Sequence, residues 1–154
     1  LFFPSFFSFS KVHFLFPRMS FEERVQEVTK QVVLSFQPAF VQTMDRMRHR
    51  MAALYRPSST LVWNGTLFTG ADSIGAFYNT LPMSKTVFDT FDVQPLIINP
   101  PTVEPVCATL LITATGHVEY DGSNARSFGE TFVLRLEAST NMWFIQSDCF
   151  RLDT

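Results

Sequence analysis

The sequence predicts an α+β fold in which a curved antiparallel sheet packs against about three helices. Two observations lead to this prediction. Helical spacing of apolar residues is found in the first half of the chain, and strand-like segments separated by turn-forming residues fill the chain from Lys85 onward. Helices that precede an antiparallel meander are typical of this class, with the helices on one face of the sheet. A length of 154 residues fits one domain with one core.

The first helix is predicted to begin at Ser20, because Ser20 and Glu23 have the spacing of a capping box. The apolar residues that follow at helical spacing are Val25, Val28, Val32 and Phe36. Pro38 is expected to kink or break this helix, since proline lacks the backbone donor that the helix needs. Asp45 is then expected to cap a second helix that runs from Arg46 to Tyr55.

A hairpin and a third helix are predicted next. Asn64-Gly65 stands between Leu61-Val62-Trp63 and Leu67-Phe68, and Asn-Gly between apolar runs is the strongest short signal for a hairpin. The apolar residues at helical spacing beyond the hairpin are Ile74, Phe77, Tyr78 and Leu81, and Pro82 follows them directly. We therefore expect a short helix that ends before Pro82.

The second half of the chain is predicted to form four strands, at about 86–98, 106–120, 126–138 and 142–151. Because side chains alternate between the faces of a strand, Phe132 and Leu134 are placed on the helix side, and Val133 on the other. The same alternation places Phe88 and Asp92 on the second face. This face combines apolar and neutral residues with few charges, which is typical of an association surface. A neutral face exposed to solvent remains an alternative.

Composition limits the function classes. The formal net charge is -2, which argues against tight nucleic-acid binding by this chain alone. The basic group at Arg46, Arg48, His49 and Arg50 is interpreted as a solvated helix face, or as a contact for acidic groups of a partner. Neither Cys107 nor Cys149 has the spacing of a zinc ligand, so no metal or cofactor is expected. Eighteen Phe residues predict a core or an interface rich in aromatic rings.

Residues 1–18 are treated apart from the domain expected at 19–154. The segment contains seven Phe, but Pro4, several Ser and Lys11 interrupt its apolar residues, so it cannot span a bilayer. It also lacks the order of charges and small residues typical of a signal peptide. Met19 is the expected start of the protein, and 1–18 is expected to be non-native or disordered. A targeting segment remains the alternative.

Several short strings resemble the nuclear transport factor 2-like family. These strings are Met44-Asp45, Leu54-Tyr55, Leu61-Val62-Trp63-Asn64-Gly65, Leu81-Pro82, Asp92-x-Gln94-Pro95 and Trp143-x-Ile145-x-Ser147-Asp148-Cys149-Phe150-Arg151. The Leu-Val-Trp-Asn-Gly and Ser-Asp-Cys-Phe-Arg strings are similar to the NXT type, the small cofactor of messenger RNA export. The resemblance covers about Phe36 to Asp153.

The resemblance implies a cone-shaped fold and a non-catalytic adaptor of the nucleus, cytoplasm and nuclear pore. The implied partner is an NXF-type mRNA export receptor, whose similar domain packs sheet against sheet. The large subunit is implied to bind RNA, and the pair to reach the Phe-Gly repeats of the pore. Asp92 has the position of an aspartate that pairs with an arginine of the large subunit, and Gln94 lies beside it. The other expected interface residues are Phe88, Leu111, Thr113, Thr131, Val133, Arg135, Cys149, Phe150 and Arg151.

Two other functions remain open. A homodimeric import factor for the GTPase Ran would use the same sheet face, but it carries an acidic residue where this chain has Asn64. A cone-fold isomerase or dehydratase would need an acid between sheet and helices, and Asp89 and Glu130 are the candidates. Both carboxyls are interpreted as solvated or paired at the rim of the cone, because no second acid or His stands at a matching strand position.

Overall fold

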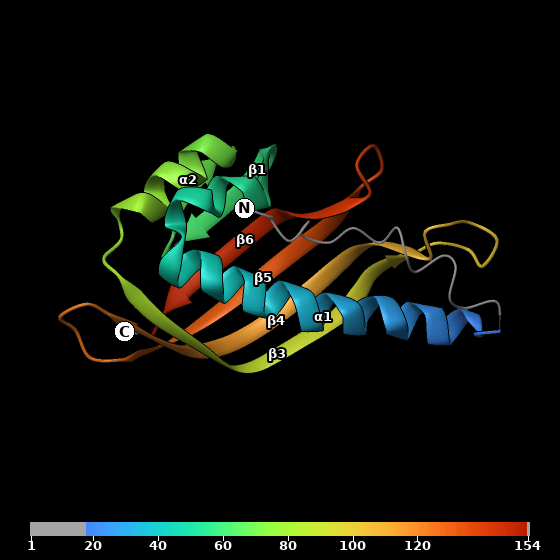
Figure 1. The fold of residues 1–154 in the computed structure, drawn as a ribbon, viewed down its shortest axis with the longest axis horizontal. Helices are drawn as coiled ribbons and strands as arrows, with labels where there is room; N and C mark the ends of the chain where they lie inside the picture. Colours follow the sequence, from blue (N-terminus) through green and yellow to red (C-terminus); the bar gives the residue numbers. More distant parts are fainter. Residues whose placement is uncertain (1–17, 154) are drawn as a thin grey trace.

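A computed structural model describes residues 18–153, and its elements follow the predicted order (Figure 1). Helix α1 (Phe21–Arg46) and the short 3-10 helix η1 (Arg48–Leu54) precede β1 (Tyr55–Trp63), β2 (Thr66–Thr69) and α2 (Ala71–Thr80). The four long strands are β3 (Ser84–Ile98), β4 (Cys107–Tyr120), β5 (Arg126–Glu137) and β6 (Met142–Leu152). The predicted α+β class is confirmed. The expectation for 1–18 concerns residues that lie, apart from Arg18, outside the described part.

The strands form one six-stranded sheet in the order β2-β1-β6-β5-β4-β3. Strands β3 to β6 make the predicted antiparallel meander. Strand β1, however, lies parallel to β6, so the sheet is mixed. Alternation along a strand shows which face a residue takes but not which distant strand lies beside it, so the sequence did not show this pairing.

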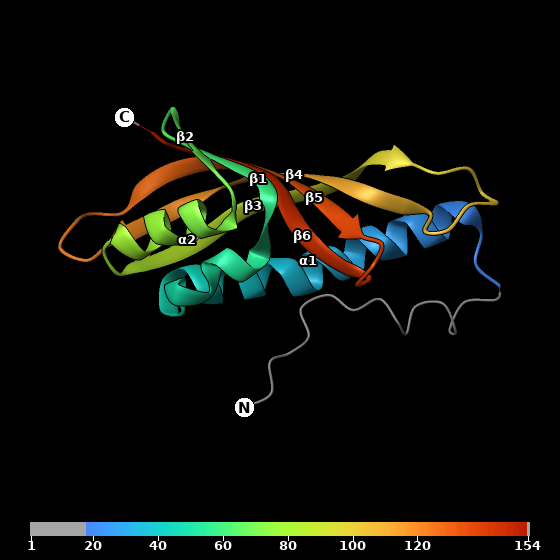
Figure 2. The same ribbon diagram turned by 90° about the horizontal axis from the view of Figure 1, so that it is seen from above.

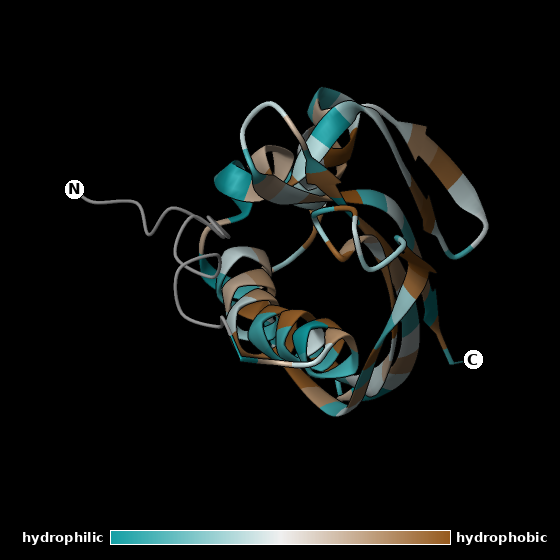
Figure 3. Cartoon of the chain, turned by 90° about the vertical axis from the view of Figure 1, so that its right-hand side faces the viewer, coloured by the Kyte–Doolittle hydropathy of each residue, from teal (hydrophilic) through white to brown (hydrophobic). Residues whose placement is uncertain are grey.

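The helices lie against one face of the sheet, as Figure 2 shows. Figure 3 looks along the molecule and shows the sheet curving around α1. Aromatic side chains fill the space between the two layers. The ring of Phe132 on β5 packs edge-on against Phe40 at 4.9 Å and against Phe36 at 5.3 Å. The abundance of Phe therefore serves the core, where large rings bury the most apolar area.

Helix α1 begins as predicted and continues further than predicted. Ser20 Oγ accepts from the backbone N–H of Glu23, and the Glu23 carboxylate accepts from the backbone N–H of Ser20, so the capping box is formed. The prediction that Pro38 interrupts the helix is wrong, because α1 runs for 26 residues through it. Pro38 is exposed, while Phe36 and Phe40 on either side of it are buried. Their packing on the sheet holds both halves of the helix.

The predicted capping role of Asp45 is also wrong. Helix η1 has Met47 at its N-cap and no side-chain cap. The Asp45 carboxylate instead accepts from Ser84 Oγ at 2.6 Å, from the backbone N–H of Thr86 at 2.8 Å and from Thr86 Oγ1 at 2.8 Å. These bonds attach the beginning of β3 to the end of α1. An acid that bonds to a distant strand has the same local sequence pattern as an acid that caps a helix. The sequence alone therefore predicted a cap at Asp45.

The hairpin at Asn64-Gly65 and the helix before Pro82 are confirmed. Asn64 has φ 48° and Gly65 has φ 87°, and positive φ at both central residues is the geometry that Asn-Gly favours in a tight hairpin turn. Helix α2 ends at Thr80, and Leu81 leaves the helix in an extended conformation. The restriction that a proline places on the residue before it accounts for this ending.

Replacement of Gly116 by alanine should destabilise the chain. A Cβ at Gly116 would lie 2.2 Å from the carbonyl oxygen of Val87 and 2.8 Å from the ring of Phe128. Strands β3 and β4 would have to separate, at a cost of about 1–3 kcal/mol in the free energy of unfolding. Gly129→Ala is the matched control, because a Cβ there meets no atom within 4 Å. Urea unfolding of both variants checks this, and equal losses would contradict it.

Candidate functional site

The sheet face that points away from the helices, here called the outer face, is built by cross-strand rows of side chains. Its central row joins Asp92 on β3 to Thr113 on β4, then to Thr131 on β5, Cys149 on β6 and Val62 on β1. The row is neutral except at Asp92, which stands at the edge of the sheet. The charge in this row is therefore placed at one side, and the middle of the row is suited to burial.

A second row runs beside the first and is more apolar. It joins Gln94 to Leu111, Val133 and Ser147 in the same strand order. Arg135 and Arg151 are exposed and stand beyond these two rows at opposite ends of the face. The structure thus places nine of the eleven expected interface residues on one face. They are Asp92, Gln94, Leu111, Thr113, Thr131, Val133, Arg135, Cys149 and Arg151.

Asp92 lies on the outer face without a counter-ion. It is exposed, and no hydrogen bond or ion pair joins it to any other residue between 18 and 153. Arg151 stands three strands away on β6, which is about 14 Å at the usual spacing between strands. An internal ion pair between these two side chains is therefore out of reach. A carboxylate so placed can accept a cation from another molecule.

The expected place of Phe88 on the outer face is wrong. A β-bulge between Phe88 and Thr90 inserts an extra residue into β3 and reverses the alternation before it. The Phe88 ring therefore points toward α1, 6.4 Å from Phe40 and 5.5 Å from Phe128. Val87 takes the outward position and is 51% exposed. Phe88 belongs to the core and cannot contact a partner on the outer face.

Phe150 is the second expected interface residue that the structure places elsewhere. Its ring is 1% exposed and stacks on Trp63 at 3.8 Å and on Phe128 at 5.1 Å. Neighbouring residues of a strand face opposite sides, so Cys149 and Phe150 cannot share the outer face. Cys149 is the exposed one of the two.

The opposite face of β5 and β6 holds an acid–tyrosine cluster, which consists of Glu130, Asp148, Tyr55 and Tyr78. All four side chains are buried, with 0–3% of each residue exposed. Tyr55 Oη donates to Asp148 Oδ2 at 2.7 Å, and Tyr78 Oη donates to the same oxygen at 3.2 Å. Glu130 stands on β5 diagonally across from Asp148 on β6. No Lys, Arg or His of the described residues forms an ion pair with either carboxyl.

Burial controls the protonation of this cluster. It raises the pKa of Glu130 well above the ordinary value, and the nearby Asp148 raises this pKa further. Burial also raises the pKa of Asp148, to about 6, while hydrogen bonds from Tyr55, Glu130 and Tyr78 act in the opposite direction. Both shifts favour one proton on the carboxyl pair over two buried carboxylates.

The two acids considered for catalysis have different surroundings. Asp89 lies in the expected place, exposed at the rim, where its carboxylate is 2.6 Å from His117 Nδ1. The interpretation of Glu130 as a rim residue is wrong, because Glu130 and Asp148 lie together in the core. Asp148 is the second acid that the sequence analysis missed. Alternation from the buried Phe150 would have placed it inward, since the two residues are two positions apart.

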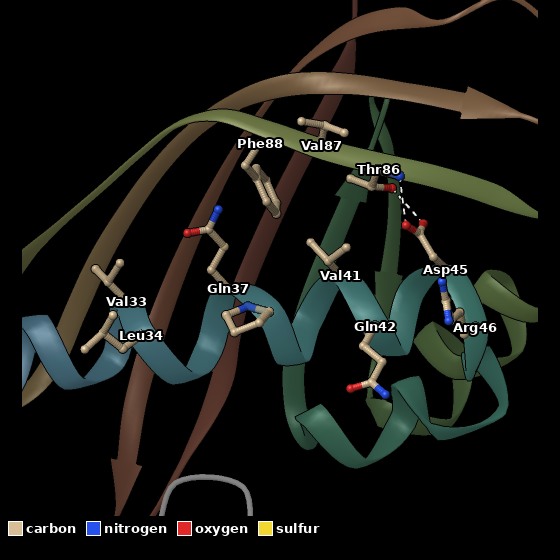
Figure 4. Close-up of a pocket in the computed structure, with 11 residues that line it drawn as sticks. Val33, Leu34, Gln37, Val41, Gln42, Asp45, Arg46, Thr86, Val87 and Phe88 are labelled. Carbon is tan, nitrogen blue, oxygen red and sulfur yellow. Dashed lines mark hydrogen bonds between the residues drawn. The ribbon is translucent and has the colours of Figure 1, made fainter.

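A groove of about 750 Å³ lies on another part of the surface, between α1 and β3 (Figure 4). Leu34, Val41 and Phe88 give it an apolar lining, and Arg46 stands at one end. Arg48 is directed elsewhere and holds the fold, because it donates to the carbonyls of Met44 and Leu81 and to Ser84 Oγ. The predicted basic helix face is thus divided, and Arg48 is not available to a nucleic acid.

Residues 18–153 contain no cluster of three or more His, Cys, Asp or Glu that could hold a metal ion. Within the same residues, no helix has the length and apolarity that a membrane crossing requires. Cys107 is buried and Cys149 is exposed, and both thiols are free.

Comparisons with known proteins give a consistent family. The family model described as the Nuclear transport factor 2 (NTF2) domain matches residues 32–152. The chain is 35% identical over 118 residues to NTF2-related export protein 1 of Bos taurus, a match that covers 75% of this chain and 82% of the relative. The solved structure of nuclear transport factor 2 from Cryptosporidium parvum is similar with a TM-score of 0.67 and 25% identity, over 84% of this chain and 95% of that one.

The same fold also occurs among enzymes. A solved structure from Novosphingobium aromaticivorans, provisionally named a scytalone dehydratase, is similar with a TM-score of 0.65 over 84% of this chain and 87% of that one. Its identity to this chain is 8%, so the likeness concerns the fold alone. The sequence relative described above is named as an export protein.

Proposed function

The chain belongs to the nuclear transport factor 2 family, and from this premise we propose that it is the small, non-catalytic subunit of an mRNA export receptor. Its partner is a larger NXF-type subunit with a similar domain. The two domains pack sheet against sheet, and the larger subunit supplies the binding of RNA. The net charge of -2 on this chain agrees with that division of roles.

The observation that carries the proposal is the outer face. Two neutral rows centred on Leu111, Thr113, Thr131 and Val133 are open to solvent or half-buried in the isolated chain. A face that is depleted in charge at its centre, with polar and charged groups at its edges, has the anatomy of a protein interface. A standard interface buries about 800 Å² on each partner, which a sheet of this size can supply.

Asp92 gives the interface its specificity. Since this carboxylate has no counter-ion within residues 18–153, its burial against an apolar surface would be costly. An arginine of the large subunit meets this need with a charge-assisted hydrogen bond, and Gln94 on the neighbouring row adds a polar contact. In a homodimer, the cations that could approach Asp92 of the other copy are Arg135 and Arg151, which stand at opposite ends of this face.

Complex formation stabilises the domain of the partner and completes the unit that docks on Phe-Gly nucleoporins. We place the protein in the nucleus, in the cytoplasm and at the nuclear pore. A role as a Ran import factor has less support. The Asn64 side chain is neutral, and its Oδ1 atom accepts from the backbone N–H of Leu152 at 2.8 Å. The Asn64 side chain therefore joins the turn between β1 and β2 to strand β6, and it carries no negative charge.

Purification of the tagged full-length chain from nuclear extract tests this proposal. We expect a larger NXF-type protein in near one-to-one amount, identified by mass spectrometry. A preparation that contains only copies of this chain together with Ran would overturn the proposal in favour of the import factor. A chain recovered alone, with no larger subunit even after co-expression with an NXF-type protein, would also overturn it.

A further inference from the structure

The carboxyl pair of Glu130 and Asp148 connects three parts of the fold. Asp148 is on β6 and Glu130 is on β5, while the hydroxyls that reach Asp148 come from Tyr55 at the beginning of β1 and from Tyr78 in α2. Tyr78 also packs edge-on against Trp63 at 5.9 Å. The hydrogen bonds to Asp148 therefore help to hold α2 against the sheet. They depend on the charge state of the pair that accepts them.

The cluster has room for only one negative charge. Glu130 Oε1 and Asp148 Oδ1 are both buried without a donor among the described side chains and backbone groups, and the two carboxyls lie within hydrogen-bonding reach of each other. Two carboxylates this close, buried and without a cation, repel each other and lose their hydration. A single proton between them removes one charge and supplies the missing hydrogen bond.

The groups that surround the pair do not offer a substitute for this proton. Tyr55 and Tyr78 face Asp148, and burial raises the pKa of both hydroxyls well above the ordinary value, so they stay neutral donors. Tyr120 on β4 interacts with Glu130 electrostatically and is neutral for the same reason, with a pKa of about 12. Cys149 stands near Glu130 but is exposed on the outer face. The Arg48 guanidinium interacts electrostatically with Tyr120 and Asp45 and forms no ion pair with Glu130 or Asp148.

We infer that Glu130 and Asp148 share one proton and form a latch between α2 and the sheet that loosens as the pH rises. Loss of the proton leaves two buried carboxylates, and hydration of the second one requires Tyr78, and the helix α2 that carries it, to move away from Asp148. The latch is independent of the proposed mRNA export role, because it concerns the isolated chain. Its effect on a partner would be indirect, through Thr131 and Cys149, which are the chain neighbours of the pair on the outer face.

The stability of the folded chain depends on pH because the folded and unfolded chains bind the Glu130 proton with different affinities. In the unfolded chain Glu130 loses its proton near its ordinary pKa, whereas the folded chain keeps the proton to a higher pH. Stability is therefore greatest in mild acid and declines with rising pH until the folded Glu130 itself titrates. Asp148 adds to the decline at the acid end, up to its pKa of about 6. Over the pH range in which Glu130 is protonated in the folded chain and ionised in the unfolded chain, the unfolding equilibrium constant rises about tenfold per pH unit.

The experiment compares the full chain with Glu130→Gln by urea unfolding at pH 6.0 and pH 7.5. The side-chain amide of this variant can still donate to Asp148, but it has no proton to lose. We expect the unfolding constant of the wild type, divided by that of E130Q, to rise across this interval, by up to about 30-fold. Glu119→Gln, at an exposed position on β4, is the matched control and should follow the wild type. A ratio that stays constant within about twofold would overturn the inference.

Two further readouts separate the latch from a general change in stability. Infrared spectra of the wild type at pH 7.5 should contain the carbonyl band of a buried protonated carboxyl, and E130Q should lack that band. The rate of hydrogen exchange in α2 of the wild type, divided by the rate in α2 of E130Q, should rise from pH 6.0 to pH 7.5. The absence of the band from the wild type, or a ratio of exchange rates that does not change with pH, would contradict the latch.

Discussion

Charge reversal at Asp92 is expected to abolish the complex with the NXF-type subunit while the chain stays folded. Asp92→Arg replaces an attraction for the partner's arginine by repulsion, and it does so on a surface that becomes buried. Disruption of a buried charge pair costs about 2–5 kcal/mol of binding free energy, so the affinity should fall about 30-fold or more. Because Asp92 has no partner within residues 18–153, unfolding of the isolated variant should match that of the wild type.

The control for this experiment is Asp121→Arg, which makes the same charge change in the exposed turn between β4 and β5. Titration calorimetry with the large subunit should give wild-type affinity for Asp121→Arg and an affinity at least about 30-fold weaker for Asp92→Arg. Replacement of the partner's arginine by glutamate should restore part of the lost affinity. Full affinity of Asp92→Arg would show that the charge pair does not exist.

Truncation of Phe132 should have the largest effect on the stability of the isolated chain. This ring is completely buried and contacts both Phe36 and Phe40, so it joins β5 to the middle of α1. Phe→Ala in a packed core costs about 3–5 kcal/mol, because the transfer free energy is lost and a cavity remains. Urea unfolding of Phe132→Ala measures this loss directly.

Phe144→Ala is the comparison for Phe132→Ala. Phe144 faces outward on β6, half-buried, and its ring lies under the guanidinium of Arg56 at 5.1 Å. An exposed cation–π contact contributes about 0.5–1 kcal/mol, so this variant should lose much less stability. If the two variants lost equal stability, the core would not be centred on the contact between β5 and α1.

Local signals in the sequence predicted the elements that local interactions form. The capping box at Ser20, the Asn64-Gly65 turn and the alternation of β5 all depend on neighbours within a few residues, and all three are present. The same alternation identified most of the outer face. These features are predictable because hydrogen bonds and side-chain directions repeat at short, fixed intervals.

The predictions from the sequence were wrong at residues whose structure depends on contacts with distant parts of the chain. Asp45 resembles a helix cap but bonds to β3, and Pro38 is tolerated because the packing of α1 on the sheet holds the helix. Phe88 changed faces through a bulge that alternation cannot reveal. Asp148 was missed because a buried acid differs from an exposed one only in its surroundings. Tyr55 and Tyr78, which satisfy Asp148, are 93 and 70 residues away in the chain.

The alkylation rate of Cys149 tests the central claim most directly. Cys149 is exposed in the central row of the outer face, whereas Cys107 is buried and its pKa is raised by burial. Iodoacetamide should therefore modify Cys149 in the isolated chain and leave Cys107 intact as an internal control. In the complex with the NXF-type subunit, we expect the modification of Cys149 to be at least about 100-fold slower, since an interface core excludes water and reagent. An unchanged rate in a complex shown to be intact would contradict sheet-to-sheet packing.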